Sequence, residues 1–349
     1  MIKLYALVLC SSFFACAFAI PAMSVVAHRI GLVDKPGGRK RHQGVVPLVG
    51  GIAIFFCILC AAALGLHVDT PLLLSLGALL ILGIYDDLFD MAGMKKLLAQ
   101  IGICIFLVVQ TGVHIRSLGT LSGNVELLLG DFGIALTIIA MVGLVNAMNM
   151  VDGLDGLAGG LSIMALLHLV VAMHLIDRPV STEDVQLIIV VCGALAAFLI
   201  YNLGPAKHKI FLGDSGAMLL GLFLAYIVIK ASQTQPLTST LPTSLVAWIV
   251  ALPVFETLSL MARRIRTGRS PFSPDRNHLH HLMIDNGFSP LHSLLLILVL
   301  AGTIFWTGFS ISRYGGLISG LIFVMMPMAY YLVIIYPLKM RLRKSEPQQ

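Results

Sequence analysis

Residues 185–203 have the sequence VQLIIVVCGALAAFLIYNL, which contains no charged side chain. A helix of this length rises about 28 Å, close to the thickness of the hydrocarbon core of a bilayer. Similar runs recur along the whole chain, and only 11% of its 349 residues are charged, against roughly 25% in a soluble domain. This composition excludes a soluble enzyme, a secreted disulfide scaffold and a disordered regulator, and it predicts an all-α polytopic membrane protein.

About eleven apolar runs are separated by charges or by clusters of glycine and proline. They lie at residues 4–26, 47–66, 71–85, 97–113, 129–148, 160–176, 185–203, 214–230, 242–262, 291–309 and 315–337. No hydrophilic stretch between them is long enough to fold by itself. Residues 1–349 are therefore expected to form a single integral membrane domain.

The basic residues predict the orientation of this domain. When the loops between the runs are taken alternately, one set holds 18 of the 23 Lys and Arg residues, and positive charge is retained on the cytoplasmic side. We therefore expect a periplasmic N-terminus, a cytoplasmic C-terminus and an uncleaved first run. The net charge of +6 suits membrane lipids with anionic headgroups and requires no nucleic acid.

Aspartates on the predicted cytoplasmic side gather at the ends of apolar runs. The groups are Asp86, Asp87 and Asp90; Asn149, Asp152 and Asp155; and Asp214. The spacing of three in the second group would place its members on one face of a helix. Short oxygen donors suit Mg²⁺, which takes one or two carboxylates and completes its coordination with water and phosphate. The pattern predicts a Mg²⁺–diphosphate site at the cytoplasmic face, with Mn²⁺ as the alternative metal and solvation of helix ends as the simpler explanation.

The longest cytoplasmic loop, residues 263–290, combines arginines with histidines. Its polar residues include Arg263, Arg264, Asp275, Arg276, His278, His280 and His281. Imidazoles beside arginines favour phosphate oxygens over zinc, since no H-E-x-x-H pattern is present. Glu256 lies inside the run 242–262, where either a functional role or a hydrogen-bonded helix contact would explain it equally well.

Four motifs together resemble the polyprenyl-phosphate N-acetylhexosamine-1-phosphate transferases. They are DDLFD at 86–90, NAMNMVDGLDG at 146–156, FLGDSG at 211–216 and SPDRNHLHH at 273–281. They occur in the order of that family, and the first loop, from Asp34 to Gly51, is similar as well. The form of the last motif resembles the branch that uses UDP-N-acetylglucosamine (UDP-GlcNAc), because the branch using UDP-N-acetylmuramoyl-pentapeptide has a different histidine-rich loop.

The resemblance implies transfer of GlcNAc-1-phosphate from UDP-GlcNAc to undecaprenyl phosphate, which gives undecaprenyl-diphosphate-GlcNAc and UMP. This would be the first membrane step of a cell-surface glycan, such as O-antigen lipopolysaccharide, in the bacterial cytoplasmic (inner) membrane. It also leaves a homodimer open. The catalytic loops would be about 28–46, 86–96, 149–160, 204–214 and 263–290.

Residue roles carry over motif by motif. Asp214 and Asn149 match the metal–diphosphate centre, and Asp86 and Asp87 match a pair that binds metal or handles the acceptor phosphate. Lys96, or the adjacent Lys95, would contact phosphate. Asp152 and Asp155 would orient the nucleotide or act as base. Substrate binding is implied for Asp34, Arg263, Arg264, Asp275, Arg276, His278, His280 and His281.

Three other functions have weaker sequence support. CDP-alcohol phosphotransfer requires Asp-Gly-x-x-Ala-Arg, whereas Leu154, Asp155 and Gly156 follow Asp152-Gly153 here. A transporter or lipid flippase would show charges near mid-span and internal symmetry, and only Glu256 meets the first expectation. Transfer from a different UDP-N-acetylhexosamine, or from UDP-N-acetylmuramoyl-pentapeptide, would use the same kind of site.

Overall fold

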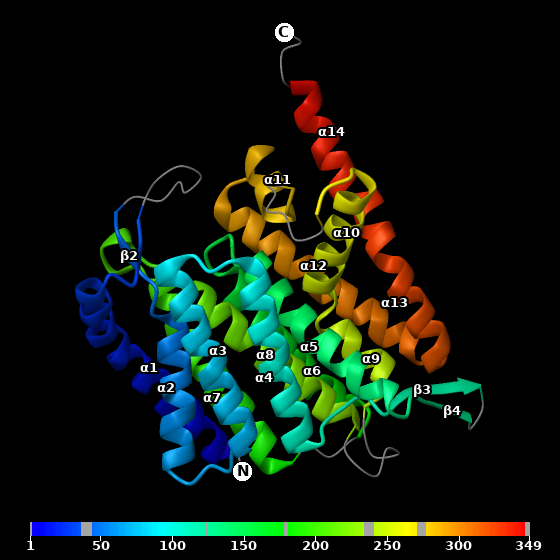
Figure 1. Ribbon diagram of the computed structural model, residues 1–349, viewed down its shortest axis with the longest axis horizontal. Coiled ribbons are helices and arrows are strands. Elements are labelled where there is room, and N and C mark those ends of the chain that lie inside the picture. The colour runs from blue at the N-terminus through cyan, green and yellow to red at the C-terminus, as the bar shows by residue number, and fades with distance from the viewer. Residues whose placement is uncertain are drawn as a thin grey trace.

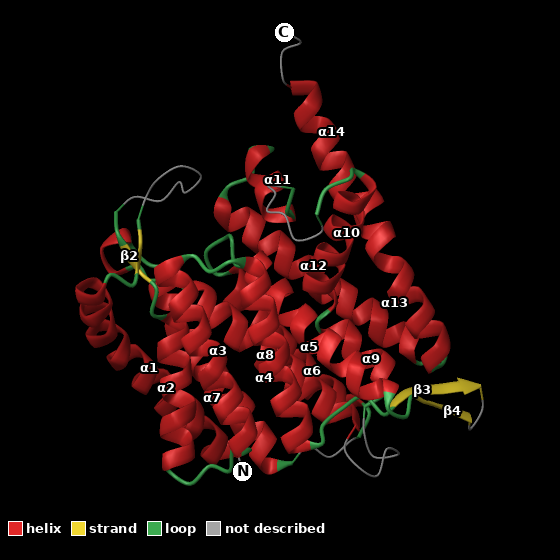
Figure 2. Ribbon diagram, in the orientation of Figure 1, coloured by secondary structure: helices red, strands yellow, loops and turns green. Residues whose placement is uncertain are grey.

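The computed structural model describes residues 2–35, 44–122, 125–177, 181–233, 241–270 and 277–345 (Figure 1). Most of these residues are helical (Figure 2). The long helices are α1 (Ile2–Ile30), α3 (Thr70–Phe89), α4 (Gly93–Thr111), α5 (Phe132–Val151), α6 (Leu157–Leu175), α7 (Thr182–Asn202), α8 (Gly213–Gln233), α12 (Pro290–Ser312) and α13 (Gly316–Tyr330). The remaining α-helices are α2 (Gly50–Ala63), α9 (Thr243–Ile249), α10 (Ala251–Arg266), α11 (Leu279–Asp285) and α14 (Tyr336–Ser345), and the π-helical segment Tyr331–Ile335 joins α13 to α14 in one long span.

The helices confirm an all-α polytopic membrane fold. Among the described residues, nine helices are long and apolar enough to cross a membrane, counting α13 and its continuation into α14 as one. Helices α9 and α10 form a tenth candidate span that is bent by 80°. The predicted run at 47–66 forms only the 14-residue α2, which is about 21 Å long and shorter than the hydrocarbon core. The described residues thus give nine or ten candidate spans, together with the shorter α2, where the sequence predicts about eleven.

Helix α8 forms the centre of the bundle and determines where the site lies. Of the most apolar 18-residue stretch of α8, 89% is buried inside the protein. The helix packs against α2, α3, α5, α6 and α9. Glycines permit this approach: a Cβ on Gly83 of α3 would lie 2.2 Å from the Cα of Ser215, and one on Gly51 of α2 would lie 2.4 Å from the Cα of Gly216. The N-terminus of α8 is thus in backbone contact with α2 and α3.

The outermost helices present apolar side chains to the surroundings. In α1, and in the span that begins with α13, only 17% of the most apolar 18-residue stretch is buried inside the protein. Phe14 and Phe18 of α1 are 54% and 78% exposed. In a bilayer such side chains contact lipid, so their exposure costs nothing comparable to exposure in water.

Two small antiparallel hairpins interrupt the helical pattern. Strands β1 (Val33–Asp34) and β2 (Val46–Pro47) pair after α1, and Leu48 then bridges to Phe211 just before α8. Strands β3 (Ser117–Ser122) and β4 (Val125–Leu128) lie between α4 and α5. In Figure 1, β3 and β4 lie at the lower end with the N-terminus, whereas β2, α11 and α14 lie at the upper end.

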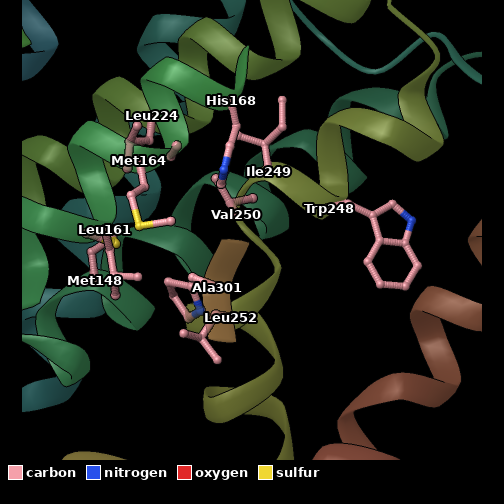
Figure 3. Close-up of a pocket in the computed structure, with 12 residues that line it drawn as sticks. Met148, Leu161, Met164, His168, Leu224, Trp248, Ile249, Val250, Leu252 and Ala301 are labelled. Atoms are coloured by element: carbon pink, nitrogen blue, oxygen red, sulfur yellow. The ribbon is translucent and has the colours of Figure 1, made fainter. Parts of the chain in front are cut away.

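A small cavity lies at the bend between α9 and α10 (Figure 3). Its volume is about 20 Å³, and its lining includes Met148, His168, Trp248 and Val250. The ring of His168 stacks on Phe305, with centroids 4.0 Å apart. This space is sufficient for about one water molecule, so it is not a substrate site.

Candidate active site

Lys96 connects two of the acidic motifs. Its Nζ lies 2.5 Å from Asp86 Oδ2 near the end of α3 and 2.5 Å from Asp214 Oδ2 at the start of α8. The side chains of Lys96 and Asp86 are only 13% and 9% exposed, so solvent screens their attraction less than at a surface. Lys95 is exposed. Of the two lysines that the sequence left open, Lys96 is therefore the one that reaches the acidic motifs.

Asp87 holds the backbone that carries Asp214. Its Oδ1 accepts a hydrogen bond from the backbone N–H of Asp214 at 3.0 Å, and its Oδ2 accepts one from that of Ser215 at 3.4 Å. These N–H groups belong to the first turn of α8, where a carboxylate satisfies helix donors and interacts favourably with the helix dipole. Gly213 enters the helix with φ of +74°, a conformation that favours glycine.

Asn149 connects α5 to the same centre. Its Nδ2 donates to Asp214 Oδ1 at 2.9 Å. One turn earlier, Asn146 Nδ2 donates to Gln100 Oε1 at 2.7 Å, and the buried Gln100 in turn contacts the sulfur of Met218 at 3.1 Å. Polar contacts between α4, α5 and α8 thus continue from the site into the apolar bundle.

The motif after α5 forms a turn, so the helical face predicted from its spacing was wrong beyond Asn149. Helix α5 ends at Val151, and Asp155 lies in the turn with its Oδ2 2.5 Å from Lys209 Nζ. Burial and the carboxylates of Asp214, Asp87 and Asp155 raise the pKa of Asp152 well above its ordinary value. The Asp152 carboxyl is therefore more easily protonated than an exposed aspartate.

The histidines form a cluster against this turn. The ring of His280 lies 4.2 Å from that of His281 and 5.8 Å from that of His278, between centroids. A Cβ on Gly153 would lie 2.3 Å from His280 Nε2, so the absence of a side chain at Gly153 lets the ring approach. Burial lowers the pKa of His280 to about 3, despite the opposing effect of Glu256. His280 is therefore neutral at physiological pH.

The remaining predicted substrate residues have varied positions. Arg263 and Arg264 lie in the last turn of α10, where Arg264 is buried. Asp34 lies in β1, in the hairpin whose following residue Leu48 contacts the segment before α8. Asp275 and Arg276 fall outside the described residues.

The oxygen donors of this centre fit a magnesium ion. Among the described residues, no group of three or more His, Cys, Asp or Glu side chains is arranged so that it could hold a metal ion by itself. Mg²⁺ needs no such group, because one or two carboxylates with water and substrate phosphates suffice. The carboxylates of Asp86, Asp87 and Asp214 supply hard oxygen donors, and the Asp214 side chain is 38% exposed, which leaves access to solvent and substrate.

Two features of the site were not predicted from the sequence: the pairing of Lys209 with Asp155 and the contact between Gly153 and His280. Lys209 lies in the expected catalytic loop 204–214, but its partner Asp155 is 54 positions away, so the pairing could not be read from the sequence. Gly153 belonged to a recognised motif, but only the fold brings the ring of His280 against it. Glu256 was noticed as an intramembrane carboxylate, and the hydrogen-bonded contact considered for it is confirmed: its Oε1 accepts from the Leu279 N–H at 2.8 Å.

Comparison with known proteins agrees with the motifs. The family model of glycosyl transferase family 4 matches residues 70–232, which include the acidic motifs from α3 to α8. Undecaprenyl-phosphate alpha-N-acetylglucosaminyl 1-phosphate transferase of Yersinia pestis is 37% identical over 306 residues, covering 84% of this chain and 80% of the relative. The enzymes of that name in Escherichia coli K12 and Haemophilus influenzae are 36% and 34% identical over 79% and 82% of this chain, and over 75% and 81% of their own lengths. Both the motifs and the identity along most of its length show that this chain belongs to glycosyl transferase family 4, the polyprenyl-phosphate N-acetylhexosamine-1-phosphate transferases.

Proposed function

We propose that this protein transfers GlcNAc-1-phosphate from UDP-GlcNAc to undecaprenyl phosphate. The observation that carries the proposal is the convergence of Asp86, Lys96, Asn149 and Asp214 at the ends of four helices. The relatives, which are 34–37% identical to this chain over the aligned residues, are named as undecaprenyl-phosphate alpha-N-acetylglucosaminyl 1-phosphate transferases, which supports the same transfer here. A site at helix ends suits an acceptor whose phosphate lies at the membrane surface while its tail lies in lipid.

The reaction exchanges one phosphoanhydride bond for another. An oxygen of the acceptor phosphate forms a bond to the sugar-bearing phosphorus, the bond from that phosphorus to the bridging oxygen breaks, and UMP leaves with that oxygen. A phosphomonoester has its second pKa near 6, so the acceptor is largely dianionic at neutral pH and already nucleophilic. Positioning and neutralisation of charge are then the main requirements.

The chain supplies these requirements through its own side chains. Lys96 lies between Asp86 and Asp214 and provides positive charge where two anionic substrates would meet. Lys209 provides a second ammonium beside Asp155. The neutral imidazole of His280, adjacent to Gly153, would donate to phosphate or sugar oxygens of the donor.

We propose Mg²⁺ as the cofactor, with Mn²⁺ as a substitute. Asp214 would be the principal ligand, supported by Asp86 or Asp87 and by the amide oxygen of Asn149. The ion would neutralise diphosphate charge as the UMP oxygen leaves. Because Asp87 also holds the start of α8, its replacement would disturb both the metal site and the helix.

The orientation remains the one that the basic residues predict. We propose that the end carrying the acidic motifs faces the cytoplasm of a bacterial inner membrane, where UDP-sugars are made. The same end carries α11 and α14 (Figure 1), and α14 includes the basic residues Lys339 and Arg341. A homodimer stays a prediction.

Purified protein in detergent would test the reaction. It would be mixed with undecaprenyl phosphate and labelled UDP-GlcNAc, with Mg²⁺ or with EDTA, and both butanol-extractable label and UMP would be measured. We expect equal amounts of lipid-linked label and UMP with Mg²⁺, and neither with EDTA. Transfer only from UDP-GalNAc or only from UDP-N-acetylmuramoyl-pentapeptide would show that this compound, and not UDP-GlcNAc, is the donor. No transfer by folded protein from any of the three would overturn the proposal and favour a transporter.

A further inference from the structure

Glu256 is a carboxylate inside a candidate membrane span. It lies in the middle of α10, and only 3% of its side chain is exposed. Burying an ionised carboxylate is costly unless charges or hydrogen bonds compensate. The groups that contact the Glu256 carboxylate therefore indicate its role.

Within the described residues, both polar contacts of the Glu256 side chain are to the histidine-rich segment. Oε1 lies 3.1 Å from His278 Nδ1 and accepts from the backbone N–H of Leu279 at 2.8 Å. Leu279 is the first residue of α11, a helix of seven residues, which is too short to be stable by itself. Glu256 thus satisfies a first-turn N–H of α11 from another helix.

His280 is the residue after Leu279, so the bond from the Leu279 N–H to Glu256 also fixes the backbone that carries the His280 ring. His280 is only 1% exposed, and within the described part of the chain neither of its ring nitrogens has a hydrogen-bond partner. Its Nε2 faces Gly153, next to Asp152. A buried imidazole with two unused nitrogens is costly, so its position must be imposed by the surrounding structure and is suited to a polar ligand.

We propose that Glu256 is a positioning residue for the donor site. It holds His278 and the start of α11 so that His280 lies against the Asp152–Gly153 turn, where the donor's phosphate or sugar oxygens supply the missing hydrogen bonds. This inference rests on the proposed function, because it takes the histidine segment to bind the UDP-sugar. Glu256 itself touches no reacting atom.

Two variants of similar size separate the hydrogen bond from the packing. Glu256→Leu removes the acceptor, whereas Glu256→Gln can keep an amide oxygen at the Oε1 position, where it accepts from the Leu279 N–H and contacts His278 Nδ1. Ser259→Ala is the matched control, because Ser259 in the same buried face bonds only to the carbonyl of Glu256 at 2.9 Å. We expect Glu256→Leu to raise KM for UDP-GlcNAc or lower kcat/KM for it about tenfold to a hundredfold. KM for undecaprenyl phosphate should change less than about twofold, and the Gln and Ser259 variants should stay within about threefold of the wild type.

Hydrogen exchange supplies a readout that does not depend on turnover. Peptides covering residues 279–285 should exchange faster in Glu256→Leu than in the wild type and in Ser259→Ala, while peptides from α8 stay equally protected. Unchanged exchange in α11 together with unchanged kinetics would overturn the proposal. So would an equal loss of affinity for both substrates.

A second variant approaches the same contact from the other side. Gly153→Ala would displace His280 without touching Glu256. If Glu256 acts through His280, the double variant Glu256→Leu/Gly153→Ala should be little worse than the worse single variant. Additive losses would overturn the proposal. If the wild type forms no UMP, the proposed function fails, and the exchange experiment still decides whether Glu256 holds α11.

Discussion

Lys96 Nζ lies 2.5 Å from Asp214 Oδ2 across 118 positions of sequence, and the same ammonium contacts Asp86. Two carboxylates that would repel each other are thus held at one point by a single cation. The arrangement places positive charge at the helix ends where two phosphate-bearing substrates would meet. It also makes Lys96 the clearest target for substitution.

Lys96→Met should lower kcat by about a hundredfold or more, because it removes the charge that offsets the carboxylates and the developing phosphate charge. Lys95→Met is the matched control, since Lys95 is adjacent and exposed, and its kcat should stay within about twofold. Radiolabel transfer into butanol measures both variants. Equal losses in the two variants would show that general charge, and not the Lys96 contact, is responsible.

Asp214→Asn should reduce turnover by about a thousandfold, because the amide keeps the shape but loses the charge proposed to bind Mg²⁺. Membrane insertion should be unchanged, since the α8 backbone remains held by Asp87. Transfer assays at increasing Mg²⁺, with quantification of the protein in membranes, test both statements. Wild-type activity in this variant would remove Asp214 from the mechanism.

Gly83→Ala should destabilise the protein by about 1–3 kcal/mol and lower activity as well. The new Cβ would lie 2.2 Å from the Cα of Ser215, so α3 would be forced away from the start of α8. Gly102→Ala in α4 is the control, because no described atom outside its own stretch of helix lies within 4 Å of its Cβ position; it should be neutral or stabilising by up to about 1 kcal/mol. Thermal unfolding in detergent distinguishes them, and similar midpoints would contradict the close α3–α8 contact.

Lys230→Met should lower stability but leave the chemistry intact. At the other end of α8, Lys230 Nζ bonds Asp69 at 3.1 Å and Asp184 at 2.8 Å and so joins α8 to the starts of α3 and α7. Lys230 is 16 positions from Asp214, about 24 Å along the helix. We expect a lower unfolding midpoint with KM for both substrates within about twofold. A specific change in either KM would show that the two ends of α8 are coupled.

The acidic motifs illustrate how far sequence reasoning extends. Asp86, Asn149 and Asp214 follow or begin apolar runs, and the alternation of runs predicts that they share one side of the membrane. Their hydrogen bonds through Lys96 and to one another confirm that they meet. The family resemblance favoured Lys96 and kept Lys95 as the alternative, because the apolar pattern of α4 does not show which of the two lysines faces the acidic motifs.

The sequence by itself determined the class of fold, the approximate spans and the motifs, because apolar length and the chemistry of Asp, Lys and His are local properties. Only the tertiary structure decided that α8 is central, that Asp87 holds its N-terminus and that Glu256 anchors the histidine segment. Lipid is as apolar as a protein core, so a buried helix such as α8 and a peripheral one such as α1 have similar compositions. Which faces pack together is therefore decided by contacts between distant segments, such as those at Gly51 and Gly83, and these contacts exist only once the bundle has formed.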